Sequence, residues 1–437
     1  MYTVQSVVCY TLYAVTTIFV FKFVTNNVKE PYMDEYFHYH QAKNYCIGNY
    51  KHWDPSITTP PGLYLTTQAI EFIITSYQLL NVEKCSLLLM RLTNLLFMLA
   101  LPFIFTMVYR KIRQEEKESS SYKTSSCMLS SLCLCSHPLI YFFTFLYYTD
   151  IGSLFFTMSS LTLHYYNKHL NASIFAIISI VYRQTNIILV LYLIGLTVLN
   201  EFRSNCSQSQ ILRLYVYSQS ETRSSIEYLK NNYSITLGHQ QHHQFVLHFA
   251  QLPYFILYTT FFIIMHIVTN KKHLVNFRQF IFKHPFVVVF LILLTFLFIK
   301  YFTYEHLFLI SDNRHYTFYI WSKFFKRYVA FRYLLIPVYV SCSILLYLQL
   351  YDRSLINVIL LLVCILLATV LQKLLEFRYF ILPYCLLRLQ LNEKQSTKIA
   401  LFLEILQATI INAVTIYVFC NKPFLWPDNE NIQRFMW

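Results

Sequence analysis

The sequence is poor in charged residues. Asp, Glu, Lys and Arg make up 13% of its 437 residues, about half the share found in soluble domains. Hydrophobic residues make up 56%, and the mean hydropathy is +0.43. This composition leaves too little polar surface for a water-soluble globule, and it excludes a disordered chain, a collagen-like fibre and a disulfide-rich secreted scaffold. We therefore expect a polytopic membrane protein.

Glycine is scarcer still, with five residues in the whole chain. With so few glycines, we expect neither glycine-rich phosphate-binding loops nor GxxxG-driven helix packing to be a main feature of the structure. Positive charge is in excess, because 35 Lys and Arg stand against 21 Asp and Glu and give a net charge of +14. In membrane proteins such an excess collects in cytosolic loops, so we expect membrane lipids and no nucleic acid as partners.

Uncharged runs close to the ~20 residues of a transmembrane helix recur along the chain. The candidate spans are Val4–Phe21, Leu92–Tyr109, Ser125–Thr149, Ile151–Asn167, Val246–Val268, Pro285–Ile299, Tyr333–Tyr351, Ser354–Gln372 and Ile405–Asn421. Two shorter halves, Ala172–Tyr182 and Asn186–Asn200, meet at the polar residue Arg183 and its neighbours. We expect an all-α protein with about eleven to thirteen transmembrane helices, forming one membrane-embedded domain over residues 1–437.

The Lys/Arg-rich segments Arg110–Lys123, Glu201–Lys230 and Lys271–Lys283 should be cytosolic by the positive-inside rule. Residues 25–85 then form a large luminal first loop, and residues 201–244 a polar cytosolic loop. Only one long apolar run separates the last two basic segments, and one crossing cannot return the chain to the same side. Either that run re-enters the membrane without crossing, or a span is missing.

Within the first loop, Gly62–Leu80 is apolar but short and carries Glu71. We interpret it as an amphipathic helix at the luminal interface, with Ser86–Tyr109 as the second span. Cys46 and Cys85 share this loop, where an oxidising compartment allows them to form a disulfide or to remain free. The glycosylation sequons at Asn171 and Asn232 fall in expected cytosolic loops, so we expect neither to be used.

The segment Glu30–Gln41 follows the first span and contains the first polar cluster. On a helix that starts near Met33, the side chains of Asp34, His38 and Gln41 share one face. The pattern fits a carboxylate base at the membrane surface, a helix-capping Asp, or a metal site made of Asp34, His38 and His40.

Further polar residues stand at the ends of spans, where each is costly unless it is paired or used. They are Trp53 and Asp54 before a Pro-Pro-Gly turn, Asp150, Arg183, His306, the group Asp312, Arg314 and His315, and Arg378. His306, Arg314 and His315 suit a phosphate clamp in a luminal loop over residues 301–328; a solvated loop would also account for them.

Seven strings in this order resemble one family along nearly the whole chain: EPYMDEYFH, WDPSITTPPGLYL, FLYYTDIGS, RQTNI, DNRHYTFYIW, QKLLEFRYFILPY and the terminal QRFMW. They resemble the dolichyl-phosphate-glucose alpha-1,2-glucosyltransferase family of the endoplasmic reticulum, which adds the last glucose of the lipid-linked oligosaccharide for N-glycosylation. The resemblance implies a C-type glycosyltransferase fold in the endoplasmic reticulum membrane. It also implies one further span where residues 201–244 are polar and short.

The resemblance implies an inverting transfer from dolichyl phosphate glucose to a dolichyl-diphosphate-linked oligosaccharide. Asp34 matches the family's catalytic acidic position, and Glu35 is the next candidate. Arg314, His315, Arg378, Arg183 and His306 would bind the donor phosphate. His38, Trp53, Asp54, Asp150 and Asp312 would line the acceptor side and its loops. We expect no metal and no other cofactor.

Two alternatives remain open. A lipid or sugar transporter would carry charges and broken helices near the bilayer midplane, often in two related halves. Here the polar clusters stand at span ends, and the sequence shows no internal repeat. A related dolichyl-phosphate-sugar transferase of another step would share the same chemistry.

Overall fold

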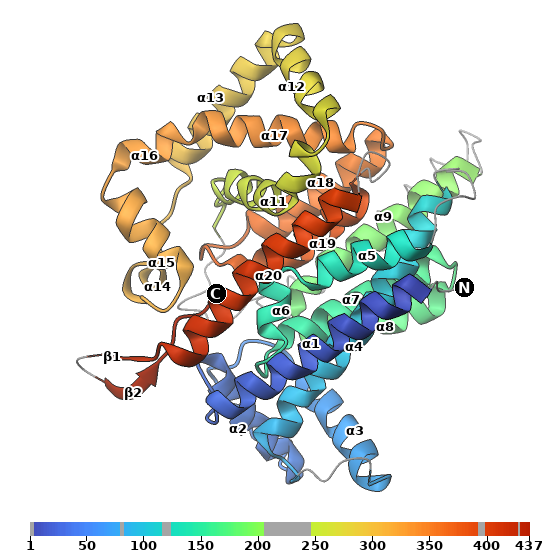
Figure 1. The fold of residues 1–437 in the computed structure, drawn as a ribbon, viewed down its shortest axis with the longest axis vertical. Coiled ribbons are helices and arrows are strands. Elements are labelled where there is room, and N and C mark those ends of the chain that lie inside the picture. Colours follow the sequence, from blue (N-terminus) through green and yellow to red (C-terminus); the bar gives the residue numbers. More distant parts are fainter. Residues whose placement is uncertain (1–3, 79–82, 116–123, 205–245, 392–397, 427–428) are drawn as a thin grey trace, which may run out of the picture.

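The computed structural model describes residues 4–78, 83–115, 124–204, 246–391, 398–426 and 429–437 (Figure 1). The first half holds α1 (Val4–Asn27), α2 (Asp34–Cys46), α3 (Gly62–Ser76), α4 (Leu87–Glu115), α5 (Thr124–Cys135), α6 (Pro138–Phe143), α7 (Thr149–Tyr165), α8 (His169–Tyr182), the 3-10 turn η1 (Gln184–Asn186) and α9 (Ile187–Ser204). The second half holds α11 (Gln251–Val268), α12 (Lys271–Lys283), α13 (Pro285–Tyr301), α14 (Leu307–Ser311), α15 (Tyr316–Ile320), the π-helical turn η2 (Trp321–Lys326), α16 (Val329–Leu334), α17 (Ile336–Leu350), α18 (Leu355–Thr369), the 3-10 turn η3 (Phe377–Phe380), α19 (Ile381–Gln390) and α20 (Lys398–Asn421). A short antiparallel hairpin of β1 (Phe424–Trp426) and β2 (Asn429–Gln433) follows.

Among the described residues, five stretches of helix are long and apolar enough to cross a membrane: α1, α4, α11, α16 with α17, and α20. A sixth is the bent pair of α12 and α13, whose axes differ by 92°. The shorter apolar helices are α8, η1 with α9, and α18. The prediction of an all-α polytopic membrane protein is confirmed; the predicted eleven to thirteen spans require that shorter helices also cross.

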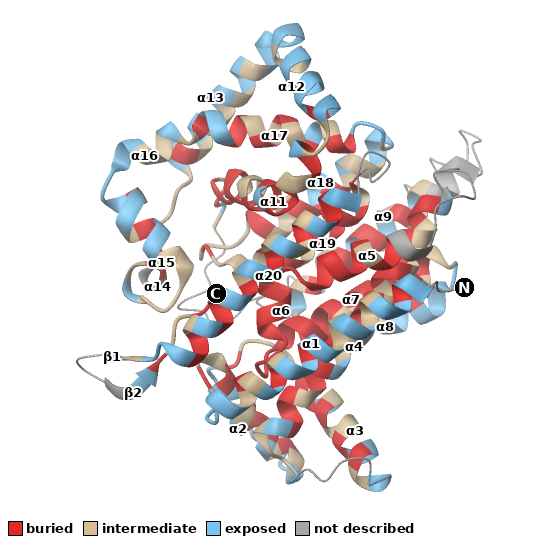
Figure 2. Cartoon of the chain, viewed as in Figure 1, coloured by how far each residue is buried: buried red, intermediate tan, exposed pale blue. Residues whose placement is uncertain are grey.

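The outer helices and the central helices differ in how many of their residues are buried (Figure 2). On α1 apolar side chains such as Val8, Leu12 and Phe19 are exposed, as expected where the surroundings are hydrocarbon. The central helix α4 packs against both α5 and α7, and α7 is almost wholly buried. A hydrogen bond from the Thr106 hydroxyl to Ser131 Oγ (3.0 Å) joins α4 to α5.

One of the predicted spans is not a continuous helix. The run Ser125–Thr149 is not one helix, because α5 ends at Cys135 and a new helix begins at Pro138. Proline lacks the N–H that would continue the earlier helix and is suited to a helix start. Residues 144–148 then form a non-helical segment before α7. Asn94 Nδ2 of α4 donates to the carbonyls of Leu146 (2.7 Å) and Tyr148 (2.9 Å), which satisfies buried backbone groups there.

The break predicted at Arg183 is confirmed, since α8 ends at Tyr182 and α9 begins at Ile187. Asn186 Nδ2 supports the break by donating to Ser153 Oγ and to the carbonyl of Ser179, both at 2.7 Å. Of the predicted cytosolic loop, residues 205–244 lie outside the described residues. Helix α11 is long and apolar enough to cross; whether it crosses or re-enters stays a prediction.

Candidate functional site

The first loop folds into α2 and α3, which pack together beside the start of α4. Helix α2 starts at Asp34, as predicted, after Met33 with a positive φ of 58°. The segment Gly62–Leu80 forms an amphipathic helix over Gly62–Ser76, again as predicted, with Phe72 on its exposed face. Gly62 is required at its start, because a Cβ there would lie 2.6 Å from the carbonyl oxygen of Val181.

Glu35 is completely buried, and its carboxylate accepts four hydrogen bonds. Arg91 donates Nε to Oε1 and Nη2 to Oε2, both at 2.7 Å. Backbone N–H groups complete the set, from Tyr147 to Oε1 (2.7 Å) and from Tyr32 to Oε2 (3.1 Å). Arg91 also donates to the carbonyl of Val28 (2.6 Å). Glu35 and Arg91 thereby join the segment between α1 and α2 to α4 and to the segment before α7, and the charge of Glu35 is paired.

Asp34 points elsewhere, and its side chain is 45% exposed. Its Oδ2 accepts a hydrogen bond from Arg378 Nη2 at 3.0 Å. Burial favours the neutral acid, but the charge and hydrogen bond of Arg378, together with the charges of His38 and His315, outweigh burial and hold the pKa of Asp34 below its usual value. Asp34 is therefore an ionised carboxylate at neutral pH.

Arg378 is held by several groups at once. It forms a short ion pair with Glu376 and lies over the rings of Phe143 and Tyr148, at 5.5 and 5.4 Å from their centroids. This arrangement combines charge pairing with cation–π contacts. Both rings flank the non-helical segment before α7, so the same segment that Glu35 anchors also positions Arg378.

Arg378 also lines a pocket together with Asp150, Arg183 and Asn186. These residues come from η3, the first turn of α7 and the break between α8 and α9. Asp150 and Arg183 form a short ion pair. The pocket thus brings together three residues that the sequence predicted, with two guanidinium groups among its walls. Arg378 connects it directly to Asp34.

His38 and Gln41 lie on the same face of α2 as Asp34, as predicted, and both are buried. His38 Nδ1 is hydrogen-bonded to the Tyr64 hydroxyl at 2.7 Å. Burial lowers the pKa of His38 to about 4, so the imidazole is neutral at physiological pH. His40 is exposed. Asp34, His38 and His40 form no metal-binding group among the residues that the structure describes.

Gln41 holds the loop that contains Trp53 and Asp54. Its Oε1 accepts from the backbone N–H of Asp54 (2.9 Å), and its Nε2 donates to the carbonyl of His52 (2.7 Å). Gln184 Nε2 donates to the carbonyl of Thr58 (2.8 Å). The loop is therefore fastened between α2 and the break that carries Arg183.

The residues Asp312, Arg314 and His315 hold the C-terminal segment. Arg314 donates Nε and Nη2 to Asp312, at 2.8 and 2.7 Å, and Nη1 to Gln433 Oε1 at 3.0 Å. His315 Nδ1 is hydrogen-bonded to the carbonyl of Trp437 at 2.7 Å. Arg314 and His315 are not among the residues that line the pocket of Arg183 and Arg378. Their role in phosphate binding stays a prediction.

The C-terminal segment itself lies close to the pocket residues. The Trp437 ring stands 6.1 Å from that of Phe377, next to Arg378. The Tyr32 hydroxyl donates to the carbonyl of Arg434 (2.6 Å), which ties the segment to the start of the first loop. His306 is buried just before α14, in the predicted loop over residues 301–328, and it does not line the pocket either.

Sequence reasoning missed Arg91 and Asn94. A signal was present, because Arg91 is an isolated cation in the apolar run that forms α4, where a charge is costly unless it is paired. A second missed group joins Arg388 to Glu404 (3.0 Å) and His266 to Glu404 (2.6 Å), in the bundle of α11, α19 and α20.

A family model described as the DIE2/ALG10 family matches residues 28–227 and 220–389. The chain belongs to this family. A human protein named "Dol-P-Glc:Glc(2)Man(9)GlcNAc(2)-PP-Dol alpha-1,2-glucosyltransferase" is 33% identical over 94% of each chain. Proteins of the same name from Mus musculus and Arabidopsis thaliana are 34% and 28% identical, the first over 94% of each chain and the second over 95% of this chain and 96% of its own. No solved structure matches the chain.

Proposed function

We propose that this protein transfers glucose from dolichyl phosphate glucose to the diglucosylated, dolichyl-diphosphate-linked oligosaccharide and forms the terminal alpha-1,2-linked glucose. The observation that carries the proposal is the similarity to enzymes named for this reaction, at 33% identity over 94% of both chains. The relatives reported above are named as transferases of this one step, so nothing favours a transporter or another step. The reaction would take place on the luminal side of the endoplasmic reticulum membrane and serve N-glycosylation.

The donor sugar is beta-linked and the product is alpha-linked, so one displacement with inversion accounts for the stereochemistry. In that step the acceptor hydroxyl loses a proton while its oxygen attacks the anomeric carbon. Asp34 is ionised and 45% exposed, which suits a general base that must reach an incoming hydroxyl. Glu35 is buried with four donors on its carboxylate, so we assign it a positioning role.

The leaving dolichyl phosphate gains charge as its bond to the sugar breaks, and cationic donors stabilise that charge. Arg378 and Arg183 line the pocket and carry planar forks of donors that fit phosphate oxygens. Arg378 also contacts Asp34 at 3.0 Å. Inversion requires the acceptor hydroxyl to attack the anomeric carbon from the face opposite the departing phosphate. We therefore expect the sugar to lie between the Asp34 carboxylate and the phosphate held in the pocket.

We assign His38 and the loop of Trp53 and Asp54 to the acceptor side. The exposed Trp53 indole offers a flat surface to a sugar ring, and the buried His38, hydrogen-bonded to Tyr64, would support that side from within. Two guanidinium groups supply the positive charge that other glycosyltransferases take from a metal ion, so we expect transfer without a metal or other cofactor.

The direct test is to incubate the purified protein with dolichyl phosphate glucose and the diglucosylated lipid-linked acceptor. We expect one additional hexose, released by an alpha-1,2-specific glucosidase. The monoglucosylated acceptor and dolichyl phosphate mannose serve as controls for another step and another donor. Transfer to either control but not to the proposed pair would overturn the assignment.

The pocket is tested by conservative changes. Arg378→Lys and Arg183→Lys keep the positive charge but lose the planar guanidinium that donates two hydrogen bonds at once. We expect each substitution to lower kcat/KM about tenfold, which corresponds to the loss of one charge-assisted hydrogen bond. Arg353→Lys is the matched control, because Arg353 binds the carbonyl of Gln390 outside the pocket. The loss should persist with short-chain polyprenyl donors, since the contact is to phosphate.

A further inference from the structure

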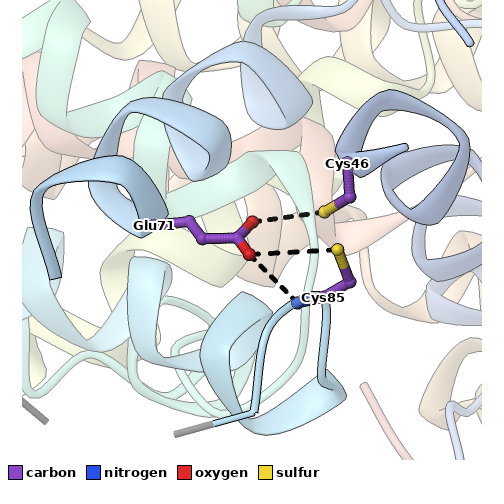
Figure 3. A group of neighbouring side chains, drawn as sticks. All are labelled: Cys46, Glu71 and Cys85. Carbon is purple, nitrogen blue, oxygen red and sulfur yellow. Dashed lines mark hydrogen bonds between the residues drawn. The ribbon is translucent and has the colours of Figure 1, made fainter. Parts of the chain in front are cut away.

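The luminal loop holds a second polar group outside the proposed catalytic site. Cys46 at the end of α2, Glu71 of α3 and Cys85 just before α4 meet with their ligand atoms within 4.8 Å of one another (Figure 3). Both thiols are free. The sequence left open whether they form a disulfide, and it did not place Glu71 between them.

The side chains are arranged around the carboxylate. Cys46 Sγ lies 3.2 Å from Oε2 of Glu71, and Cys85 Sγ lies 3.9 Å from Oε1. The backbone N–H of Cys85 donates to Oε1 at 3.2 Å. Figure 3 shows both sulfur atoms turned toward Glu71.

Glu71 is a buried carboxylate on an amphipathic helix. Among the described residues its carboxylate meets two weak thiol donors and one backbone N–H, and no cation pairs with it. A buried charge with such weak compensation is costly. A disulfide between Cys46 and Cys85 would remove both thiol donors and leave the carboxylate with the backbone N–H alone. A bound cation would compensate the charge and use all three side chains.

We propose that Cys46, Glu71 and Cys85 bind a zinc-class divalent metal ion that ties α2, α3 and the start of α4 together. Zinc binds thiolate and carboxylate ligands in a tetrahedral arrangement, and a water molecule would complete the set of four beside these three side chains. Zinc–sulfur and zinc–oxygen bond lengths place neighbouring ligands about 3.5–3.8 Å apart. One ligand atom from each of the three residues lies within 4.8 Å of the other two, so small side-chain shifts would bring them into that range. The site is structural and separate from the transfer step, because Cys46 and Asp34 stand at opposite ends of α2.

The test is the metal content of the full-length protein, purified from endoplasmic reticulum membranes without chelators. We expect about one zinc ion per chain, as for a site with three protein ligands. Cobalt added to the metal-free protein should give the sulfur-to-cobalt charge-transfer band of thiolate ligation. Neither measurement depends on glucose transfer, so the metal site and the proposed function fail independently.

Glu71→Gln distinguishes metal-bound cysteines from a disulfide between Cys46 and Cys85. The substitution removes a metal ligand and leaves both thiols in place. We expect this variant to lose most of its zinc and to unfold at a lower temperature. Cys9→Ser, which removes a thiol of α1 outside the cluster, is the matched control and should keep its zinc. Alkylation of the wild-type protein before digestion supplies a readout that does not depend on any variant folding.

The proposal is overturned if the wild-type protein contains no zinc and binds no cobalt. It is also overturned if non-reducing digestion yields a peptide in which Cys46 and Cys85 are joined by a disulfide. Free, alkylatable cysteines that become protected when zinc is added would support it.

Discussion

Asp34 and Glu35 are neighbours in the sequence, yet the two regions that receive their side chains are built in opposite ways. The Glu35 region is closed: the carboxylate and Arg91 are fully buried, and every oxygen has protein donors. The Asp34 region is half open, with one bond to Arg378 and a pocket beside it. A buried, saturated ion pair holds a structure together, whereas an accessible carboxylate next to a cation is free to meet a substrate. The first turn of α2 therefore carries one carboxylate that holds the fold together, Glu35, and one that is accessible to a substrate, Asp34.

The largest expected effect is the loss of stability when the buried Glu35–Arg91 ion pair is broken. Arg91→Ala leaves the Glu35 carboxylate buried without its cation, which costs about 3–5 kcal/mol. We expect a much lower yield of folded protein and a lower unfolding temperature in detergent. Arg110→Ala, near the other end of α4, is the control and should behave as wild type. An unchanged unfolding temperature for Arg91→Ala would show that Glu35 does not hold this region together.

The next effect concerns the open region. Asp34→Asn keeps the size of the side chain but removes the base, so glucose transfer should fall at least ~10²-fold. The unfolding temperature should change little, because the side chain is 45% exposed. Glu30→Gln, an exposed carboxylate of the same motif, is the matched control. Normal transfer by folded Asp34→Asn protein would rule out Asp34 as the base.

The Asp34–Arg378 contact predicts a pH dependence. Asp34 works as a base only when ionised, and its pKa lies below the usual value of 3.8. Transfer should therefore stay constant from neutral pH down to about pH 5 with respect to this group. Arg378→Gln removes a cation that lowers the pKa of Asp34, so the acid limb of kcat/KM should move to higher pH. An acid limb at the same pH in both proteins would show that Arg378 does not control Asp34.

The smallest effect is expected at the C-terminal segment. Arg314→Ala removes a partly exposed ion pair, one hydrogen bond and a contact with the Trp426 ring. We expect a loss of about 1 kcal/mol in stability and an unchanged KM for the donor. Arg327→Ala, an exposed arginine of the same loop, serves as control. A raised donor KM in Arg314→Ala would instead support the phosphate role that the sequence predicts.

Much of the fold could be predicted from the sequence because its signals are local. Apolar runs, a polar break at Arg183 and the start of α2 at Asp34 follow from neighbouring residues, and the structure contains each of them. The prediction of one continuous helix over Ser125–Thr149 was wrong because it rested on the apolar composition of this run. Only Pro138 and the buried donors of Asn94 explain why the chain unwinds there.

The sequence by itself determined that this is a helical membrane protein, which family it resembles, and which acidic and cationic residues stand at the ends of its spans. Those properties depend on composition and on residues close together in the chain. Only the tertiary structure decided which carboxylate is closed and which is open, because the partners lie far apart: Arg91 is 56 residues from Glu35, and Arg378 is 344 residues from Asp34. Burial and pairing are properties of those distant contacts, and they separate a residue that holds the fold from one that can act on a substrate.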